Sequence, residues 1–130
     1  RILKMVSKAT VTLCRGEGVI TPELKEKVAK EHPIGALEDL ANILRLESVE
    51  MTTAAKSGHP TSCASMAEYT AAAFFDKSGL RIDPQDPKNL WNDKFLLSKG
   101  HCAPILYAAW ALAGTVEREK LRTLRKLDSV

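Results

Sequence analysis

A helical repeat of apolar positions runs from about residue 36 to residue 56. The charged residues of this stretch mostly fall on other faces, so the pattern predicts a long amphipathic helix. The helix should end near Lys56, because Gly58 follows and permits backbone angles that break a helix. The positions that share the apolar face are Leu37, Leu40, Ala41, Leu44, Ser48, Met51 and Ala55.

A second helix is predicted over residues 61–78. Its many alanines and serines indicate close packing against another helix. Ser65 and Glu68 have the spacing of a capping box, although they equally fit a first-turn serine and an interior acid. The positions expected to be buried are Met66, Tyr69, Thr70, Ala73 and Phe74.

The next apolar run is short. Residues 95–97 read Phe-Leu-Leu between polar ends, after a proline-broken loop at residues 83–89. Their length suits a buried strand in a parallel sheet that is covered on both faces. A further helix is predicted over residues 103–113, with Gly114 as its stop and Thr115 as the cap of a last helix.

The order helix, helix, strand, helix, helix predicts an α/β fold. It corresponds to part of a doubly wound domain with a mostly parallel sheet, incomplete in this chain. We expect one domain over residues 36–130. Residues 1–35 are interpreted as a divergent amino-terminal extension, in which residues 10–13 favour a short strand and residues 21–30 a short helix.

Composition narrows the class of protein. The 130 residues are 45% hydrophobic and 27% charged, as in soluble globular proteins. The net charge of +3 is mild and there is no aromatic and basic platform, so we expect no nucleic-acid partner. The longest apolar run is too short to cross a bilayer, so we expect no membrane partner. Three cysteines without a CxxC pair predict reduced thiols and a cytoplasmic location.

Two of the three histidines lie in unusual corners. His59 lies in Ser-Gly-His-Pro, where the proline pushes it toward an extended backbone, and His101 lies in Ser-Lys-Gly-His before a helix start. His59 could transfer a proton or bind a sugar hydroxyl, with Ser62 one turn further on. His101 could donate to an anion such as phosphate, aided by the helix start and Lys99. The alternatives are an ordinary corner with Ser62 as a helix cap, and a histidine that caps a turn.

Other chemistry is disfavoured. Cys102 stands next to His101, but adjacent residues rarely point at each other, which argues against a thiol nucleophile. The histidines and cysteines have no zinc-site spacing, and no P-loop, GxGxxG or GxSxG is present.

Two long motifs carry a resemblance. The segments TTAAKSGHPTSCASMAE and NDKFLLSKGHCAPILYAAWALAG resemble the amino-terminal part of the transketolase family, over about residues 37–127. The resemblance implies a thiamine-diphosphate enzyme that moves a two-carbon ketol unit from a ketose phosphate to an aldose phosphate. It assigns residues 36–130 to the amino-terminal part of the diphosphate-binding domain.

By motif, the resemblance gives His59 a catalytic role and a contact with the sugar-phosphate substrate. Ser62 becomes a cofactor contact, and His101 a cofactor contact near the diphosphate. The family holds its diphosphate through Mg²⁺ or Ca²⁺, with a Gly-Asp-Gly loop that this sequence lacks, so we expect the metal ligands outside this chain.

The resemblance therefore implies that the chain is a fragment that is inactive alone, from a parent enzyme that works as a homodimer in the cytoplasm. The opening at Arg1, with no methionine, also indicates a chain that has been cut. Two alternatives stay open: a relative that resembles dihydroxyacetone synthase, and a non-catalytic, truncated protein that resembles transketolase.

Overall fold

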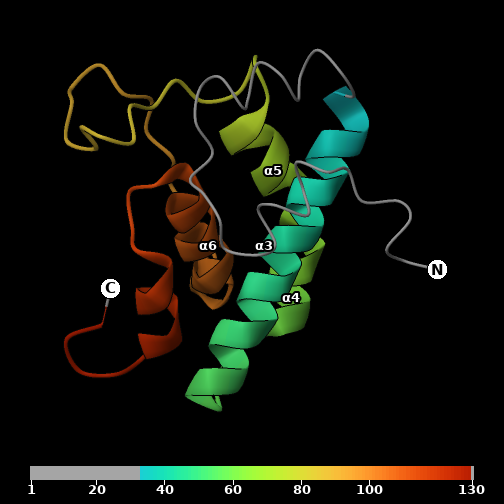
Figure 1. Cartoon of the computed structure of the whole chain (residues 1–130), viewed down its shortest axis with the longest axis vertical. Helices are drawn as coiled ribbons and strands as arrows, with labels where there is room; N and C mark the ends of the chain where they lie inside the picture. The colour runs from blue at the N-terminus through green and yellow to red at the C-terminus, as the bar shows by residue number, and fades with distance from the viewer. Residues whose placement is uncertain (1–32, 130) are drawn as a thin grey trace.

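The computed structural model describes residues 33–129 of the chain. These residues form a small helical assembly (Figure 1). The long helix α3 lies alongside α4, α5 and α6, and the C-terminal segment packs against both α3 and α6. The elements are α3 (Pro33–Ala55), α4 (Pro60–Ser65), α5 (Ala67–Phe75), the 3₁₀ helix η2 (Gly100–Cys102), α6 (Ala103–Ala113) and the 3₁₀ helix η3 (Arg118–Thr123).

Helix α3 confirms the predicted long amphipathic helix. Its apolar face is buried at Leu40, Leu44 and Met51. Two buried hydroxyls share that face without a desolvation penalty, because each donates to a carbonyl of its own helix. Ser48 donates to the Leu44 carbonyl at 2.7 Å, and Thr52 donates to the Ser48 carbonyl at 2.9 Å.

The predicted second helix is split in two. The break lies at Met66, whose N–H bonds to the Cys63 carbonyl at 3.0 Å, as in a turn three residues long. The Ser65 hydroxyl donates to the Ser62 carbonyl at 2.9 Å, so the side chain competes with the backbone for a helix acceptor. The capping-box reading of Ser65 is therefore wrong. Helix α5 also ends earlier than predicted, at Phe75.

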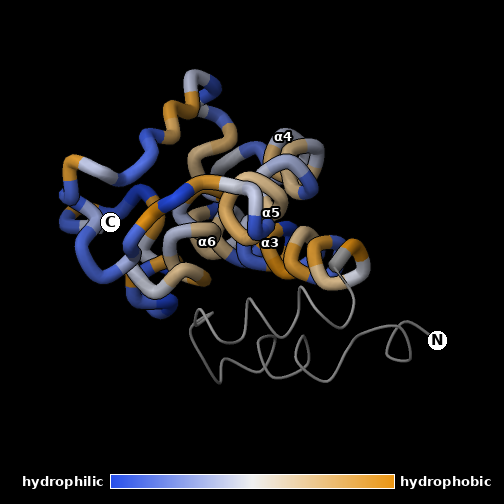
Figure 2. Tube along the Cα trace, turned by 90° about the horizontal axis from the view of Figure 1, so that it is seen from above, coloured by the Kyte–Doolittle hydropathy of each residue, from blue (hydrophilic) through white to orange (hydrophobic). Residues whose placement is uncertain are grey.

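Small residues bring α5 and α6 close to α3, which the sequence indicated for the second predicted helix. Ala67 and Ala71 on α5, and Ala108 and Ala109 on α6, are fully buried. Figure 2 shows α5 and α6 mostly on the hydrophobic side of the colour scale, next to α3. Beside them Phe74 meets the Trp110 ring edge-on at 5.2 Å. The core is thus made by helix–helix packing.

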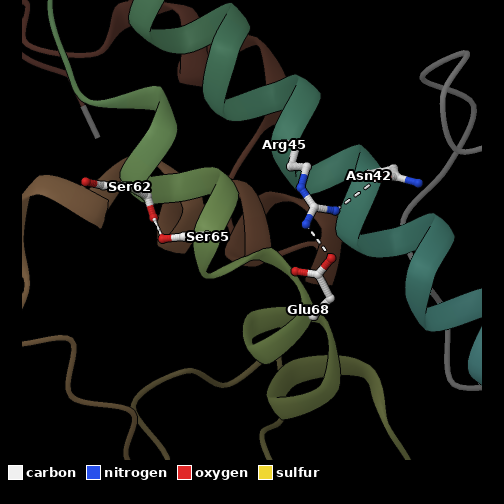
Figure 3. Close-up of polar contacts among 5 residues, drawn as sticks. All are labelled: Asn42, Arg45, Ser62, Ser65 and Glu68. Atoms are coloured by element: carbon white, nitrogen blue, oxygen red, sulfur yellow. Dashed lines mark hydrogen bonds and ion pairs between the residues drawn. The ribbon is translucent and has the colours of Figure 1, made fainter.

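A salt bridge at the surface also ties α3 to α5. The Arg45 guanidinium bonds to the Glu68 carboxylate and also donates to Asn42 at 3.1 Å (Figure 3). Glu68 lies in the first turn of α5 and Ser65 ends α4, so the second reading, a first-turn serine followed by an interior acid, is wrong as well. The partner of Glu68 lies on another helix, which a local pattern does not reveal.

The predicted strand at residues 95–97 is not formed. The residues that the structure describes contain no strand, and Leu96 is 92% exposed. Phe95 does pack inward, edge-on against Phe74 at 5.2 Å. A strand needs neighbouring strands for its backbone hydrogen bonds, and residues 33–129 supply none. The sheet of the predicted α/β fold is therefore not seen in this part of the chain.

The last predicted helix is also altered. Thr115 does not cap it, because its hydroxyl donates to the Pro84 carbonyl at 3.2 Å. The segment forms η3, which begins after Glu117 and has no side-chain cap. The strand and helix predicted within residues 10–13 and 21–30 lie outside the described residues. Within residues 33–129, no helix has the length and apolar character that a bilayer crossing requires.

Candidate functional site

The two histidine corners meet in space. The imidazoles of His59 and His101 approach edge-on, with ring centroids 4.4 Å apart and planes at 65°. His59 precedes α4 and His101 lies in η2, and both side chains are exposed. The structure therefore joins the two sequence motifs into one candidate site.

The His59 corner is built by strained and restricted backbone. Lys56 has φ +50° and Gly58 has φ +139°, a region that L side chains rarely adopt. A Cβ atom at Gly58 would overlap the Thr52 methyl group and lie 3.1 Å from the Thr52 Cβ. Pro60 then begins α4. The φ of His59, −126°, fits the extended backbone that the proline predicted, but its ψ of 75° falls short of the extended region.

The His101 corner is a 3₁₀ turn that leads into α6. The N–H of Cys102 bonds to the Lys99 carbonyl at 2.9 Å, which closes the turn around His101. The helix start at Ala103 follows directly, as predicted. Lys99 is exposed beside the corner. The sequence had placed His101 beyond a strand, whereas an irregular segment precedes it here.

Ser62 lies in the first turn of α4 and is half-buried. It does not cap the helix, because the residue at the cap position is His59 and no side chain bonds there. The alternative that made Ser62 a helix cap is therefore wrong. Its carbonyl accepts a hydrogen bond from the Ser65 hydroxyl (Figure 3). The Ser62 hydroxyl therefore lies in the first turn of α4, directly after His59.

Two buried thiols lie beneath the histidines. The Cys102 thiol donates to the Ser62 carbonyl at 3.4 Å, and the Cys63 thiol donates to the His101 carbonyl at 3.9 Å. Both cysteines are 0% exposed. Burial raises the pKa of the Cys63 thiol above its usual value. A buried thiol that keeps its proton is a poor nucleophile, so Cys63 is poorly suited to nucleophilic attack.

A depression of about 440 Å³ adjoins the His101 corner. One wall is formed by Gly100, Ala103, Pro104 and Tyr107, and the other by residues 124–129. Neither histidine lines it, so the depression lies next to the histidine pair and is not part of it.

The donor set determines what this site can do. Two exposed imidazoles and a serine hydroxyl can donate hydrogen bonds to phosphate oxygens or exchange hydrogen bonds with sugar hydroxyls. Between Pro33 and Ser129, no three histidine, cysteine or acidic side chains cluster closely enough to hold a metal ion. These donors suit the organic and phosphate parts of a cofactor.

Comparison with known proteins gives one consistent answer. The family described as transketolase, thiamine diphosphate binding domain, matches residues 37–130. Transketolase of Homo sapiens is 54% identical over 99 residues, which are 76% of this chain and 16% of that protein. Transketolase of Mus musculus is 52% identical over the same shares. Transketolase-like protein 2 of Mus musculus is 50% identical over 91 residues, 70% of this chain and 14% of that protein.

The chain thus spans about one sixth of the length of these relatives. Both histidine corners lie within the matched residues, and the match covers more than half of the chain. The chain belongs to the family of the thiamine-diphosphate-binding domain of transketolase.

Proposed function

We propose that the longer protein containing this chain is a thiamine-diphosphate-dependent transketolase. It transfers a two-carbon ketol unit from a ketose phosphate to an aldose phosphate. The observation that carries the proposal is the edge contact of His59 and His101 at 4.4 Å, because two separate motifs supply one pair of donors. The family match and the identity to transketolases support it.

The chain's own residues have distinct roles in this proposal. Ser62 and His101 would hold the cofactor, which would supply a nucleophilic carbon and an electron sink for the donor ketose. His101, at the turn before α6, donates a hydrogen bond to the diphosphate. Ser62 donates its hydroxyl to the cofactor from the first turn of α4. His59 faces the substrate, where its imidazole binds a sugar hydroxyl and carries a proton.

The rest of the site belongs to the remainder of the protein. We expect Mg²⁺ or Ca²⁺ there, held by a Gly-Asp-Gly loop, together with the sheet of a doubly wound α/β domain. We also propose a cytoplasmic homodimer, with neither nucleic-acid nor membrane partners. The 130 residues alone are expected to be inactive, since they lack the metal loop.

Two other functions remain as candidates. A relative resembling dihydroxyacetone synthase would share both motifs and differ in its acceptor. A non-catalytic protein is the other candidate, and transketolase-like proteins are among the relatives. The coding sequence beyond Val130 would distinguish an enzyme from a non-catalytic protein. A further Gly-His-Pro followed by Gly-Asp-Gly would support an enzyme, and their absence would support the non-catalytic protein.

Calorimetric titration of thiamine diphosphate with Mg²⁺ tests the cofactor site. The longer protein should bind, and His101→Ala should weaken binding about tenfold or more, as expected for the loss of a hydrogen bond to a charged group. His32→Ala is the control, because it removes the third histidine, which belongs to neither motif. His59→Ala should lower kcat/KM for the ketose phosphate and leave cofactor affinity nearly unchanged. Equal binding by His101→Ala and the control would refute the proposal.

A further inference from the structure

The two buried thiols are related by a reciprocal pattern. Cys63 donates to the carbonyl of His101, the residue before Cys102, and Cys102 donates to the carbonyl of Ser62, the residue before Cys63. Each thiol therefore bonds to the carbonyl of the residue that directly precedes the other cysteine. The pattern joins α4 to η2, two elements that no local sequence signal connects.

The two accepting carbonyls belong to residues of the candidate site. Since His101 and Ser62 are held through their backbones, their side chains remain free to meet a ligand. Cys63 also makes a backbone hydrogen bond, because its N–H donates to the His59 carbonyl at 3.3 Å. Cys63 thus contacts the backbone of both histidines, through its N–H and its thiol.

Burial makes these weak bonds matter. A thiol is a weak donor, but both sulfurs are inaccessible to water, so no solvent competes for the carbonyls. The raised pKa of Cys63 keeps the proton on sulfur, which a donor requires. A thiol is also larger than a hydroxyl and fills the apolar space between the elements.

We propose that Cys63 and Cys102 are positioning residues that hold His59 and His101 in edge contact. Neither thiol touches the ligand. They act by fixing the separation of α4 and η2, and through it the separation of the two imidazoles. The effect on cofactor affinity rests on the proposed function, whereas the effect on the histidine pair does not.

The first test follows the histidine pair by NMR on the full 130-residue chain with labelled imidazoles. Ring-to-ring cross-peaks between His59 and His101 should be present in the unmutated chain and lost in Cys63→Ala/Cys102→Ala. The double serine variant keeps two donors and should retain weaker cross-peaks. Phe75→Leu is the control, because it removes volume from the same buried core but neither thiol donor, and it should leave the cross-peaks intact. Unchanged cross-peaks in a folded double alanine variant would overturn the proposal.

A second measurement needs no substitution. Iodoacetamide alkylates accessible thiolates, and mass spectrometry identifies the modified cysteines. Cys63 and Cys102 should react slowly under native conditions, because both thiols are buried, and rapidly in concentrated guanidinium chloride. Equally fast alkylation under both conditions would refute the buried arrangement of the thiols.

Cofactor affinity of the longer protein separates this proposal from the proposed function. Cys102→Ala should weaken thiamine diphosphate binding about tenfold, and Cys102→Ser should restore most of it. Lost cross-peaks with unchanged affinity would confirm the positioning role and refute the cofactor role of His101. Retained cross-peaks would refute the positioning role whatever the affinity.

Discussion

Replacing Gly58 by alanine should destabilise the chain strongly, because two costs coincide there. The φ of +139° lies in a region nearly reserved for glycine, and forcing an L residue into such backbone costs about 1–3 kcal/mol. The new Cβ would also overlap the Thr52 methyl group, and overpacking of this kind costs about 1–3 kcal/mol. Alanine returns about 0.4–1 kcal/mol by restricting the unfolded chain. The net loss should be about 3 kcal/mol.

Urea unfolding followed by circular dichroism measures this loss, and a second substitution divides it into its two parts. Thr52→Ser removes the methyl group and keeps the hydroxyl that donates to the Ser48 carbonyl at 2.9 Å. In a double-mutant cycle with Gly58→Ala, it should recover at least about 1 kcal/mol, the overpacking part. The backbone strain should remain.

Two other glycines serve as matched controls. Gly35 and Gly100 have no atom within 4 Å of a Cβ added there. Gly35→Ala lies in α3 and should raise stability by up to about 1 kcal/mol. Gly100→Ala should fold normally, although it adjoins His101. The reasoning fails if Gly58→Ala costs less than about 1 kcal/mol, or if Thr52→Ser shows no coupling to it.

Two ion pairs offer further tests. Arg118→Ala removes the cation from the Glu47 carboxylate, whose side chain is 6% exposed. It should lower the unfolding free energy by about 1–3 kcal/mol in urea titrations, less than for a fully buried pair because Arg118 is itself 34% exposed. Arg122→Ala breaks an exposed pair and should cost under about 1 kcal/mol, so equal losses would contradict the burial argument. The hydrogen bond from Arg45 lowers the pKa of Glu68 below its usual 4.5, so this pair stabilises the fold above that pH and the effect is lost as pH falls through the lowered value. Arg45→Met should therefore reduce stability at neutral pH and match the unmutated chain in strong acid; a constant difference across pH would count against the linkage.

Helices were the most predictable part of the fold. The repeat of Leu40, Leu44 and Met51 has the helical period, so burial of one face follows from the sequence alone. Gly114 ended α6 as expected, with a left-handed φ of +88°. The break at Met66 was missed, because no proline or glycine marks it. It arises where the Ser65 hydroxyl competes for a backbone acceptor, and such competition depends on the surrounding packing.

The strand at residues 95–97 was wrong for a different reason. Its apolar composition matches a buried strand, but a strand exists only through bonds to other strands. In the described residues it has none, and Phe95 and Leu97 pack against the helical core instead. The apolar pattern of residues 95–97 therefore indicates a preference for a strand, which these residues can form only beside other strands of a sheet.

The sequence by itself determined which residues are candidates for the site and where each corner meets the start of a helix. Glycine and proline act on the backbone beside them, so the conformation around His59 follows from its neighbours. Only the tertiary structure decided that the rings of His59 and His101 lie with their centroids 4.4 Å apart. It also decided that the thiols of Cys63 and Cys102 bond to the carbonyls of His101 and Ser62. Both arrangements depend on how α4 packs against η2, and packing is a property of the whole core that no local pattern contains.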